Sequence, residues 1–304
     1  PKQMKTKMGF KLMIAAILVM VSVIPASYSS NLSAQGPLVK KPETIGSVVA
    51  AYNLPGVPDK GLKLTGPVLA DIYLGKITKW NDPRIVELNP ELSLPDADII
   101  TVHKSDGSGT TFVWTDYLSA ISPEWRDQVG KGKSVQWPTG IGAPGNEGVA
   151  NGIRGRENSI VYVELAYALT TGMPYAYIQN QAGNFVEPTL ASTEAAVAAS
   201  AANLPAGDAS WNNVTLVNAQ GADSYPIASF SYLLLNKEMA DNPSMTQTKA
   251  TALLDFIKWA ITDGQQFAPE LEYAPLPDEA VKLNQDTLGQ ITINGQPIAN
   301  STQG

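Results

Sequence analysis

The stretch Asp98–Leu118 reads DIITVHKSDGSGTTFVWTDYL, and it decides the fold. Its first residues, 98–102, are an apolar run typical of a strand, and from Thr110 onward apolar side chains recur at helical spacing. The segment between them, rich in Gly and Ser, is a tight connection from strand to helix. Because short strand patterns and helical patterns also alternate through the rest of the chain, the sequence predicts an α/β architecture.

The other expected elements follow the same alternation. Strands are predicted from β-type apolar runs, and helices from a periodicity of about 3.6 residues together with capping residues. The expected strands are 45–52, 160–163, 175–179, 214–217 and 227–235. The expected helices begin after Thr65, near a capping Asn146 and at 164–169, 192–202, 246–263 and 277–288.

Composition excludes several classes of protein. The 304 residues include no cysteine and one histidine, which removes disulfides, Cys-ligated zinc, iron–sulfur clusters, thiol nucleophiles and multi-histidine metal sites. A net charge of −7 argues against the basic surface that nucleic acid requires. Charged residues make up 16% of the chain, against roughly 25% in an average domain, which favours an exported protein. We therefore expect no metal, no cofactor and no nucleic-acid partner.

The first 30 residues have the organisation of a signal peptide. Lys5, Lys7 and Lys11 precede the apolar run Leu12–Ala26, which small polar residues follow. A basic region, an apolar stretch of about 15 residues and small residues at its end are typical of Sec-dependent export. We expect residues 1–30 to be a signal peptide or an uncleaved signal anchor, and the protein to reside in the periplasm or at the cell surface. A buried core helix is the remaining interpretation of this run.

The turn at 104–110 is a candidate oxyanion site. The first backbone N–H groups of a helix have no intrahelical partner and carry partial positive charge. Glycine lets an anion approach the backbone closely, and serine and threonine hydroxyls add donors. Lysine adds a full positive charge, which a nearby aspartate can hold in place. The candidate anion-binding residues are Lys104, Asp106, Ser108, Gly109 and Thr110; in the alternative interpretation, Ser and Thr only cap the helix.

Catalytic interpretations of this turn do not match its spacing. A P-loop requires Lys between its last Gly and the following Ser or Thr, but Gly109 is followed directly by Thr110. A serine-hydrolase elbow requires G-x-S-x-G, whereas Ser108 lies in G-S-G. His103 is the single imidazole of the chain, and we interpret it as a strand histidine without a catalytic role. We predict no catalytic residue; a phosphate-ester hydrolase that uses Ser108 or Thr110 is the weakest alternative.

A series of motifs occurs in an order typical of one known family. They span about residues 42–290 and are Val49–Val57 (VAAYNLPGV), Leu64–Pro83 (LTGPVLADIYLGKITKWNDP), Ser105–Phe112 (SDGSGTTF), Thr115–Leu118 (TDYL), Gly145–Val149 (GNEGV), Tyr162–Ala168 (YVELAYA), Ser224–Ile227 (SYPI) and Tyr273–Pro277 (YAPLP). In these motifs the chain resembles the PstS family, the phosphate-binding proteins of ABC phosphate importers.

The resemblance implies a type II periplasmic-binding-protein fold, in which two α/β lobes joined by crossover strands close on phosphate. It assigns residues 31–55 and 225–304 to lobe I and residues 56–224, with the anion-binding turn, to lobe II. The implied role is an extracytoplasmic substrate-binding protein that captures inorganic phosphate for the permease subunits of an ABC importer, and not an enzyme.

Residue by residue, the resemblance carries over to the turn at 104–110. Ser108, Gly109 and Thr110 match the family's phosphate-binding turn, and Asp106 matches the aspartate that holds a phosphate-contacting arginine. Lys104 stands at that arginine's position. Lysine keeps the charge but loses the planar, two-pronged donor, which implies weaker or less directional binding.

The front of lobe I departs from the family pattern. The family has a first strand, a phosphate-contacting T-F-P loop, a Gly/Ser-rich segment and an aspartate there, and residues 31–44 contain none of them. A carboxylate can accept a hydrogen bond from protonated phosphate, whereas sulfate has no proton to offer. The resemblance therefore implies a shortened first lobe. The alternative function is a truncated or degenerate relative that keeps a partial anion site and has no transport role.

Overall fold

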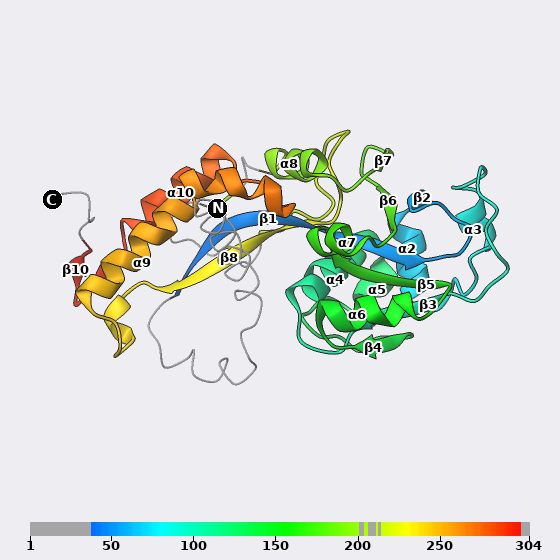
Figure 1. Ribbon diagram of the computed structural model, residues 1–304, viewed down its shortest axis with the longest axis horizontal. Coiled ribbons are helices and arrows are strands. Elements are labelled where there is room, and N and C mark those ends of the chain that lie inside the picture. Colours follow the sequence, from blue (N-terminus) through cyan, green and yellow to red (C-terminus); the bar gives the residue numbers. More distant parts are fainter. Residues whose placement is uncertain (1–37, 201–203, 206–210, 212–213, 299–304) are drawn as a thin grey trace, which may run out of the picture.

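The computed structural model describes residues 38–200, 204–205, 211 and 214–298. These residues form two lobes joined by two long strands that lie side by side (Figure 1). No helix in this part of the chain has the length and hydrophobicity of a membrane span. The expected signal segment at 1–30 lies outside the described residues, so it stays a prediction.

Strand β1 (Leu38–Asn53) belongs to both lobes. Up to Ser47 it pairs antiparallel with β8 (Ala228–Asn236), and from Val48 onward it pairs antiparallel with β5 (Ser159–Glu164). Val48 lies opposite Glu164, so the last residue of β5 marks the point where β1 passes from one lobe to the other. The expected two-lobed α/β architecture with crossover strands is confirmed.

The larger lobe is built on a mixed sheet with the strand order β2–β6–β1–β5–β3–β4. Strand β3 (Ile100–Lys104) runs parallel to β5 and to β4 (Ile141–Ala143), and β2 (Lys60–Leu64) runs parallel to β6 (Tyr175–Gln179), which also pairs with the short β7 (Phe185–Val186). Because β3 and β5 are parallel, their carboxyl ends, Lys104 and Glu164, lie at the same edge of the sheet.

Alternate side chains of the central strands are buried on opposite faces of this sheet. Val49 and Val161 belong to the core under α6 (Gly145–Arg154) and α7 (Leu165–Thr171). Val48 and Tyr162 belong to the core on the other face, with α2 (Gly66–Tyr73), α3 (Pro83–Val86), α4 (Gly109–Ile121) and α5 (Pro123–Gln128). Both faces are covered, which explains why these strands are apolar throughout and do not alternate with polar residues.

The smaller lobe packs helices on the β1–β8 ribbon. Helices α9 (Gln247–Ala260) and α10 (Asp278–Leu288) lie along it (Figure 1), and the core contains Ile45, Phe230, Leu254 and Leu288. The 3₁₀ turns η4 (Met239–Asp241), η5 (Asp263–Phe267) and η6 (Pro269–Leu271) and the pair β9 (Thr292–Ile293) and β10 (Gln296–Pro297) complete the described part of this lobe.

Helix α8 (Leu190–Ala198) contributes to the smaller lobe's core, and so do Trp211 and Leu216. The division at residue 224 instead groups them with the larger lobe. Ala196 and Val197 form the buried face of α8, which contacts both β1 and β8. The hydrophobic cores of the two lobes thus divide before α8. The lobe boundaries drawn from the sequence stay a prediction.

Most expected elements occur within a few residues of their predicted bounds, but two predictions are wrong. Residues 214–217 form no strand, because this segment has no partner strand and the Thr215 hydroxyl donates to Asp116 Oδ2 (2.8 Å). Asn146 does not cap α6, which begins at Gly145 after Pro144. The predicted helix at 192–202 begins earlier, at Leu190, and residues 201–202 lie outside the described part.

Candidate functional site

The predicted anion loop connects β3 to α4 as the sequence indicates. Ser108 is the N-cap residue of α4, and its Oγ accepts a hydrogen bond from the Thr111 N–H (3.5 Å). The Ser108 N–H itself donates to the Lys133 carbonyl (2.9 Å), which ties the loop to the segment after α5. Ser108 therefore does cap the helix. The N–H groups of Gly109 and Thr110, in the first turn of this 13-residue helix, remain available to an anion.

Lys104, Ser108 and Thr110 are brought together and are nearly buried. Their exposed fractions are 6%, 7% and 5%, and Lys104 Nζ donates to Thr110 Oγ1 (3.2 Å). Burial lowers the pKa of Lys104, while the charges of Glu164 and Asp106 act in the opposite direction. Gly109 is exposed between them, and a Cβ there would meet no atom within 4 Å. An ammonium, hydroxyls and free N–H groups thus converge at one helix terminus.

Asp106 contacts a different partner from the one that the sequence suggests. Its Oδ1 accepts a hydrogen bond from the Gly145 N–H (2.7 Å) at the start of α6. This remote carboxylate replaces the side-chain cap that Pro144 cannot supply. Asp106 therefore joins the anion loop to α6 and acts on Lys104 only through the charge that favours its protonated form.

Tyr162, on β5, contacts both ends of the loop, at Lys104 and at Thr111. Its hydroxyl accepts a hydrogen bond from the Lys104 N–H (3.1 Å) and lies 2.8 Å from Thr111 Oγ1. The ring stacks between Trp114 and Trp137, with centroid distances of 5.3 and 5.6 Å. Burial raises the pKa of Tyr162 to about 12, so the hydroxyl stays protonated at neutral pH. The loop is thus held on a rigid aromatic layer.

Glu164 brings a carboxylate to the same place. Its Oε1 accepts a hydrogen bond from Thr110 Oγ1 (3.1 Å), and its Oε2 accepts one from the Tyr273 hydroxyl (3.3 Å). Tyr273 comes from the smaller lobe, where its ring packs against Gly46 of β1. Glu164 thus connects the anion loop of one lobe with a side chain of the other.

Comparison with known proteins identifies the family. The sequence model of the PBP superfamily domain matches residues 17–263. The phosphate-binding protein PstS of Pasteurella multocida is 48% identical over 253 residues, covering 83% of this chain and 71% of the relative, and PstS of Haemophilus influenzae is 48% identical over 257 residues, covering 83% and 73%. The chain belongs to the PstS family.

Solved structures agree on the fold of this PstS-family chain. The phosphate-binding protein of Stenotrophomonas maltophilia superposes with a TM-score of 0.66 at 19% identity, covering 92% of this chain and 82% of that one. This likeness confirms the expected type II periplasmic-binding-protein fold.

Sequence reasoning missed Glu164 and Tyr273 as site residues of this PstS-family chain, although both stand in motifs that carried the resemblance. The position of Glu164 in the sequence could have indicated its role. It follows a buried strand, and the carboxyl ends of parallel strands in an open α/β sheet are where ligands bind. For Tyr273 no local pattern indicated the contact, since it lies 109 residues from Glu164 in the chain.

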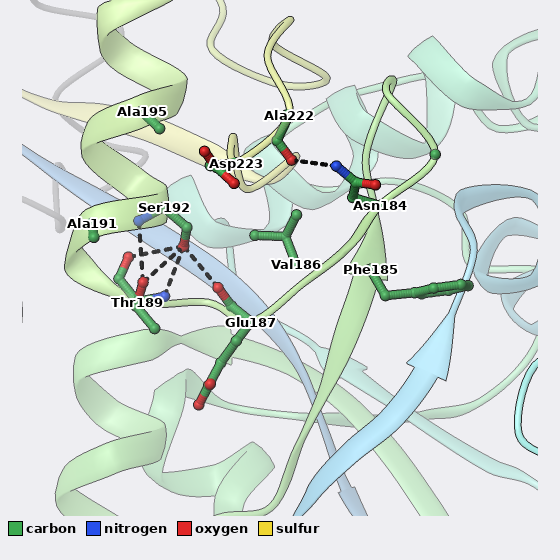
Figure 2. Close-up of a pocket in the computed structure, with 11 residues that line it drawn as sticks. Asn184, Phe185, Val186, Glu187, Thr189, Ala191, Ser192, Ala195, Ala222 and Asp223 are labelled. Carbon is green, nitrogen blue, oxygen red and sulfur yellow. Dashed lines mark hydrogen bonds between the residues drawn. The ribbon is translucent and has the colours of Figure 1, made fainter. Parts of the chain in front are cut away.

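A separate open groove of about 900 Å³ lies beside α8, and none of the predicted site residues lines it. It is lined by the segment through β7, by the first turns of α8, and by Ala222 and Asp223 (Figure 2). Its polar groups satisfy one another: Thr189 and Ser192 form a capping box, and Asn184 Nδ2 donates to the Ala222 carbonyl (3.0 Å). The groove is explained by local structure, and we assign it no ligand.

Proposed function

We propose that this PstS-family protein captures inorganic phosphate outside the cytoplasm and presents it to the permease subunits of an ABC importer. The observation that carries the proposal is the buried ammonium of Lys104 beside the Ser108 and Thr110 hydroxyls at the start of α4. The curated relatives from Pasteurella multocida and Haemophilus influenzae are named phosphate-binding proteins, which supports phosphate as the anion.

The charge balance of the loop favours an anionic ligand. Within the described part of the chain, no ion pair closer than 4.0 Å includes Lys104. A buried cation without a close counter-ion is costly, and burial accordingly lowers the pKa of Lys104. An oxyanion at the loop would supply the missing negative charge and would accept hydrogen bonds from the hydroxyls and the helix N–H groups.

A binding role accounts for the site better than a catalytic one. His103 stacks on Trp137 with a centroid distance of 4.8 Å, and its Nδ1 lies 3.2 Å from the Lys104 carbonyl oxygen. Burial lowers the pKa of His103, and these contacts hold the ring in the strand's own packing. His103 is therefore not placed as the base that the phosphate-ester hydrolase left open by the sequence would need at Ser108 or Thr110. We propose that the protein is not an enzyme.

Export and membrane association complete the proposal. Residues 1–30 would act as a signal peptide or a signal anchor, which places the binding site in the periplasm or at the cell surface. The permease subunits would recognise the two-lobed protein once phosphate has bound. Alkaline phosphatase fused after residue 40 tests export: activity in intact cells is expected, and a fusion that stays inactive in the cytoplasm would contradict it.

The central experiment is calorimetric titration of the purified protein with phosphate and then with sulfate. A complete site is expected to bind phosphate with a dissociation constant of about 1 μM, near −8 kcal/mol, whereas a partial site is weaker by several kcal/mol. Lys104→Ala and Ser108→Ala are both expected to weaken binding, and the matched control is the exposed Lys282→Ala.

Salt and a conservative variant sharpen this result. Removal of the Lys104 charge is expected to reduce the dependence of affinity on ionic strength, whereas Ser108→Ala keeps that dependence. Lys104→Arg restores the charge and adds a planar donor, so it is expected to bind phosphate at least as well as the wild type. Unchanged affinity in both alanine variants would exclude the loop as the site. Weak affinity in the folded wild type would instead support the truncated relative without a transport role.

A further inference from the structure

A surface carboxylate of the smaller lobe accepts four hydrogen bonds. Glu238 is the N-cap residue of η4, and its Oε1 accepts from the N–H groups of Ala240 (2.9 Å) and Asn294 (2.8 Å). Its Oε2 accepts from the Gly295 N–H (2.9 Å) and from Thr292 Oγ1 (2.9 Å). These donors, the backbone N–H groups of Ala240 and Gly295 first, lower the pKa of Glu238 to about 2. At neutral pH a full negative charge therefore faces two consecutive peptide N–H groups of one turn.

That turn contains a chemically labile pair of residues. Asn294 and Gly295 connect β9 to β10, both are exposed, and both have a positive φ, of 53° and 71°. Asn followed by Gly is the pair in which the next peptide nitrogen reaches the asparagine Cγ most easily, because glycine has no Cβ in the way. The pair occurs twice in the chain, and the other copy, Asn151 and Gly152, lies inside α6, where the helix fixes the backbone.

Deamidation of such a pair begins at the backbone nitrogen of the glycine. The Gly295 nitrogen loses its proton to solvent and attacks Asn294 Cγ. A bond between this nitrogen and Cγ forms, the bond from Cγ to Nδ2 breaks, and Nδ2 takes a proton from water and leaves as ammonia. Water then opens the cyclic imide to aspartate or to isoaspartate. The attack requires a deprotonated nitrogen, so a negative charge beside the N–H opposes it.

We propose that Asn294 is a deamidation site and that the charged carboxylate of Glu238 controls how fast it reacts. The carboxylate accepts the proton that Gly295 must lose, and its charge opposes the negative charge that develops on the nitrogen. By binding both N–H groups it also holds the turn in one conformation, which keeps the nitrogen away from Cγ. The proposal does not depend on phosphate binding.

Reaction at Asn294 would weaken the contact that protects it. The product places a second negative charge beside Glu238, and isoaspartate lengthens the backbone before the Gly295 N–H. Ile291 and Ile293, which precede the turn, are buried in the smaller lobe's core. Deamidated protein is therefore expected to unfold at a lower temperature than intact protein.

The test follows the purified full chain during incubation at pH 8. Peptide mapping by mass spectrometry measures the converted fraction of Asn294, and a free peptide of residues 290–298 gives the unprotected rate. In the wild type, Asn294 is expected to react at least about tenfold more slowly than in the peptide, which corresponds to about 1.4 kcal/mol of activation free energy. Glu238→Gln is expected to react at least about fivefold faster than the wild type.

Two controls separate this effect from general unfolding. The matched variant Glu279→Gln removes an exposed carboxylate of α10, and Asn294 is expected to keep its wild-type rate there. Asn151 is measured in the same samples as an internal reference in a different lobe, and its rate is expected to stay the same in Glu238→Gln.

Contrary results overturn the proposal at different steps. If Asn294 reacts as fast in the wild type as in the peptide, the carboxylate gives no protection. If Glu238→Gln shows no faster reaction at Asn294 than the wild type, the charge of Glu238 does not control it. An equal acceleration at Asn151 also overturns the proposal, because the variant would then react through loss of the fold. If Glu238→Gln does not fold, the comparison of the wild type with the peptide still decides.

Discussion

Replacing Glu43 with glutamine is expected to stabilise the protein at pH 8 and to leave its stability at pH 4 nearly unchanged. Glu43 is at the irregularity between Pro42 and Thr44 where the register of β1 against β8 shifts. Its exposed fraction is 8%, and its Oε2 has no hydrogen-bond partner among the described residues. Tyr273, from the segment after η6, is a titratable neighbour: burial raises its pKa most, and the charges of Glu164 and then Glu43 raise it further.

The magnitude follows from the burial of this carboxyl group. Burial raises the pKa of Glu43 from 4.5 to about 7. Because the pKa is raised in the folded state, the protonated form favours folding, and that contribution is complete below about pH 4.5 and is lost as the pH rises through about 7. The difference between the two pKa values corresponds to about 3 kcal/mol. Glutamine is neutral at every pH and avoids this loss.

The assay is urea denaturation of the wild type, Glu43→Gln and the exposed control Glu87→Gln at pH 4, 6 and 8. The free energy of unfolding of Glu43→Gln is expected to exceed that of the wild type by up to about 3 kcal/mol at pH 8, with a difference near zero at pH 4. A difference that is the same at all three pH values would refute the reasoning, since a pH-independent effect cannot come from the ionisation of Glu43.

Three further outcomes are expected. Asn89→Ala should lower the free energy of unfolding by about 2–3 kcal/mol, because the fully buried Asn89 side chain accepts a hydrogen bond from the Lys63 N–H (2.7 Å) and donates one to the Lys63 carbonyl (2.9 Å). Urea denaturation of this variant and of the exposed control Asn151→Ala measures the loss. Gly66→Ala should cost about 1–3 kcal/mol, since its Cβ would lie 2.6 Å from Ile121 Cγ2; the melting temperature measures this. Phosphate affinity should fall as the pH rises, and the fall should begin below the pKa of an ordinary lysine, because burial lowers the pKa of Lys104. Calorimetric titration from pH 7 to 9.5 compares the pH profile of the wild type with that of Lys104→Arg, whose side chain stays charged.

Each of these has a contrary result. A loss in Asn89→Ala no larger than that in Asn151→Ala would mean that the buried amide contributes nothing beyond its surface area. A Gly66→Ala protein that melts at the wild-type temperature would show that the side chains of Ile121 and Tyr117 both move aside freely. Identical pH profiles for the wild type and Lys104→Arg would exclude the ammonium as the group that titrates.

Local sequence pattern was sufficient for the strand–loop–helix unit that carries the candidate site. The cap at Ser108, the helix that follows it and the closing helices α9 and α10 depend on hydrogen bonds and apolar spacing within a few residues. Such interactions are encoded in the segment itself, so they can be read without the rest of the chain. The motif order likewise sufficed to recognise the PstS family.

The partners of these groups were decided by the tertiary structure. Asp106 contacts Gly145, 39 residues away, and Glu164 meets Thr110 and Tyr273 across 54 and 109 residues. The segment 214–217 has strand-like residues but no strand beside it, so it stays irregular. A hydrogen bond between distant residues exists only once the sheet order has placed their strands side by side. That order depends on which apolar faces are buried together, and no short stretch of sequence contains this information.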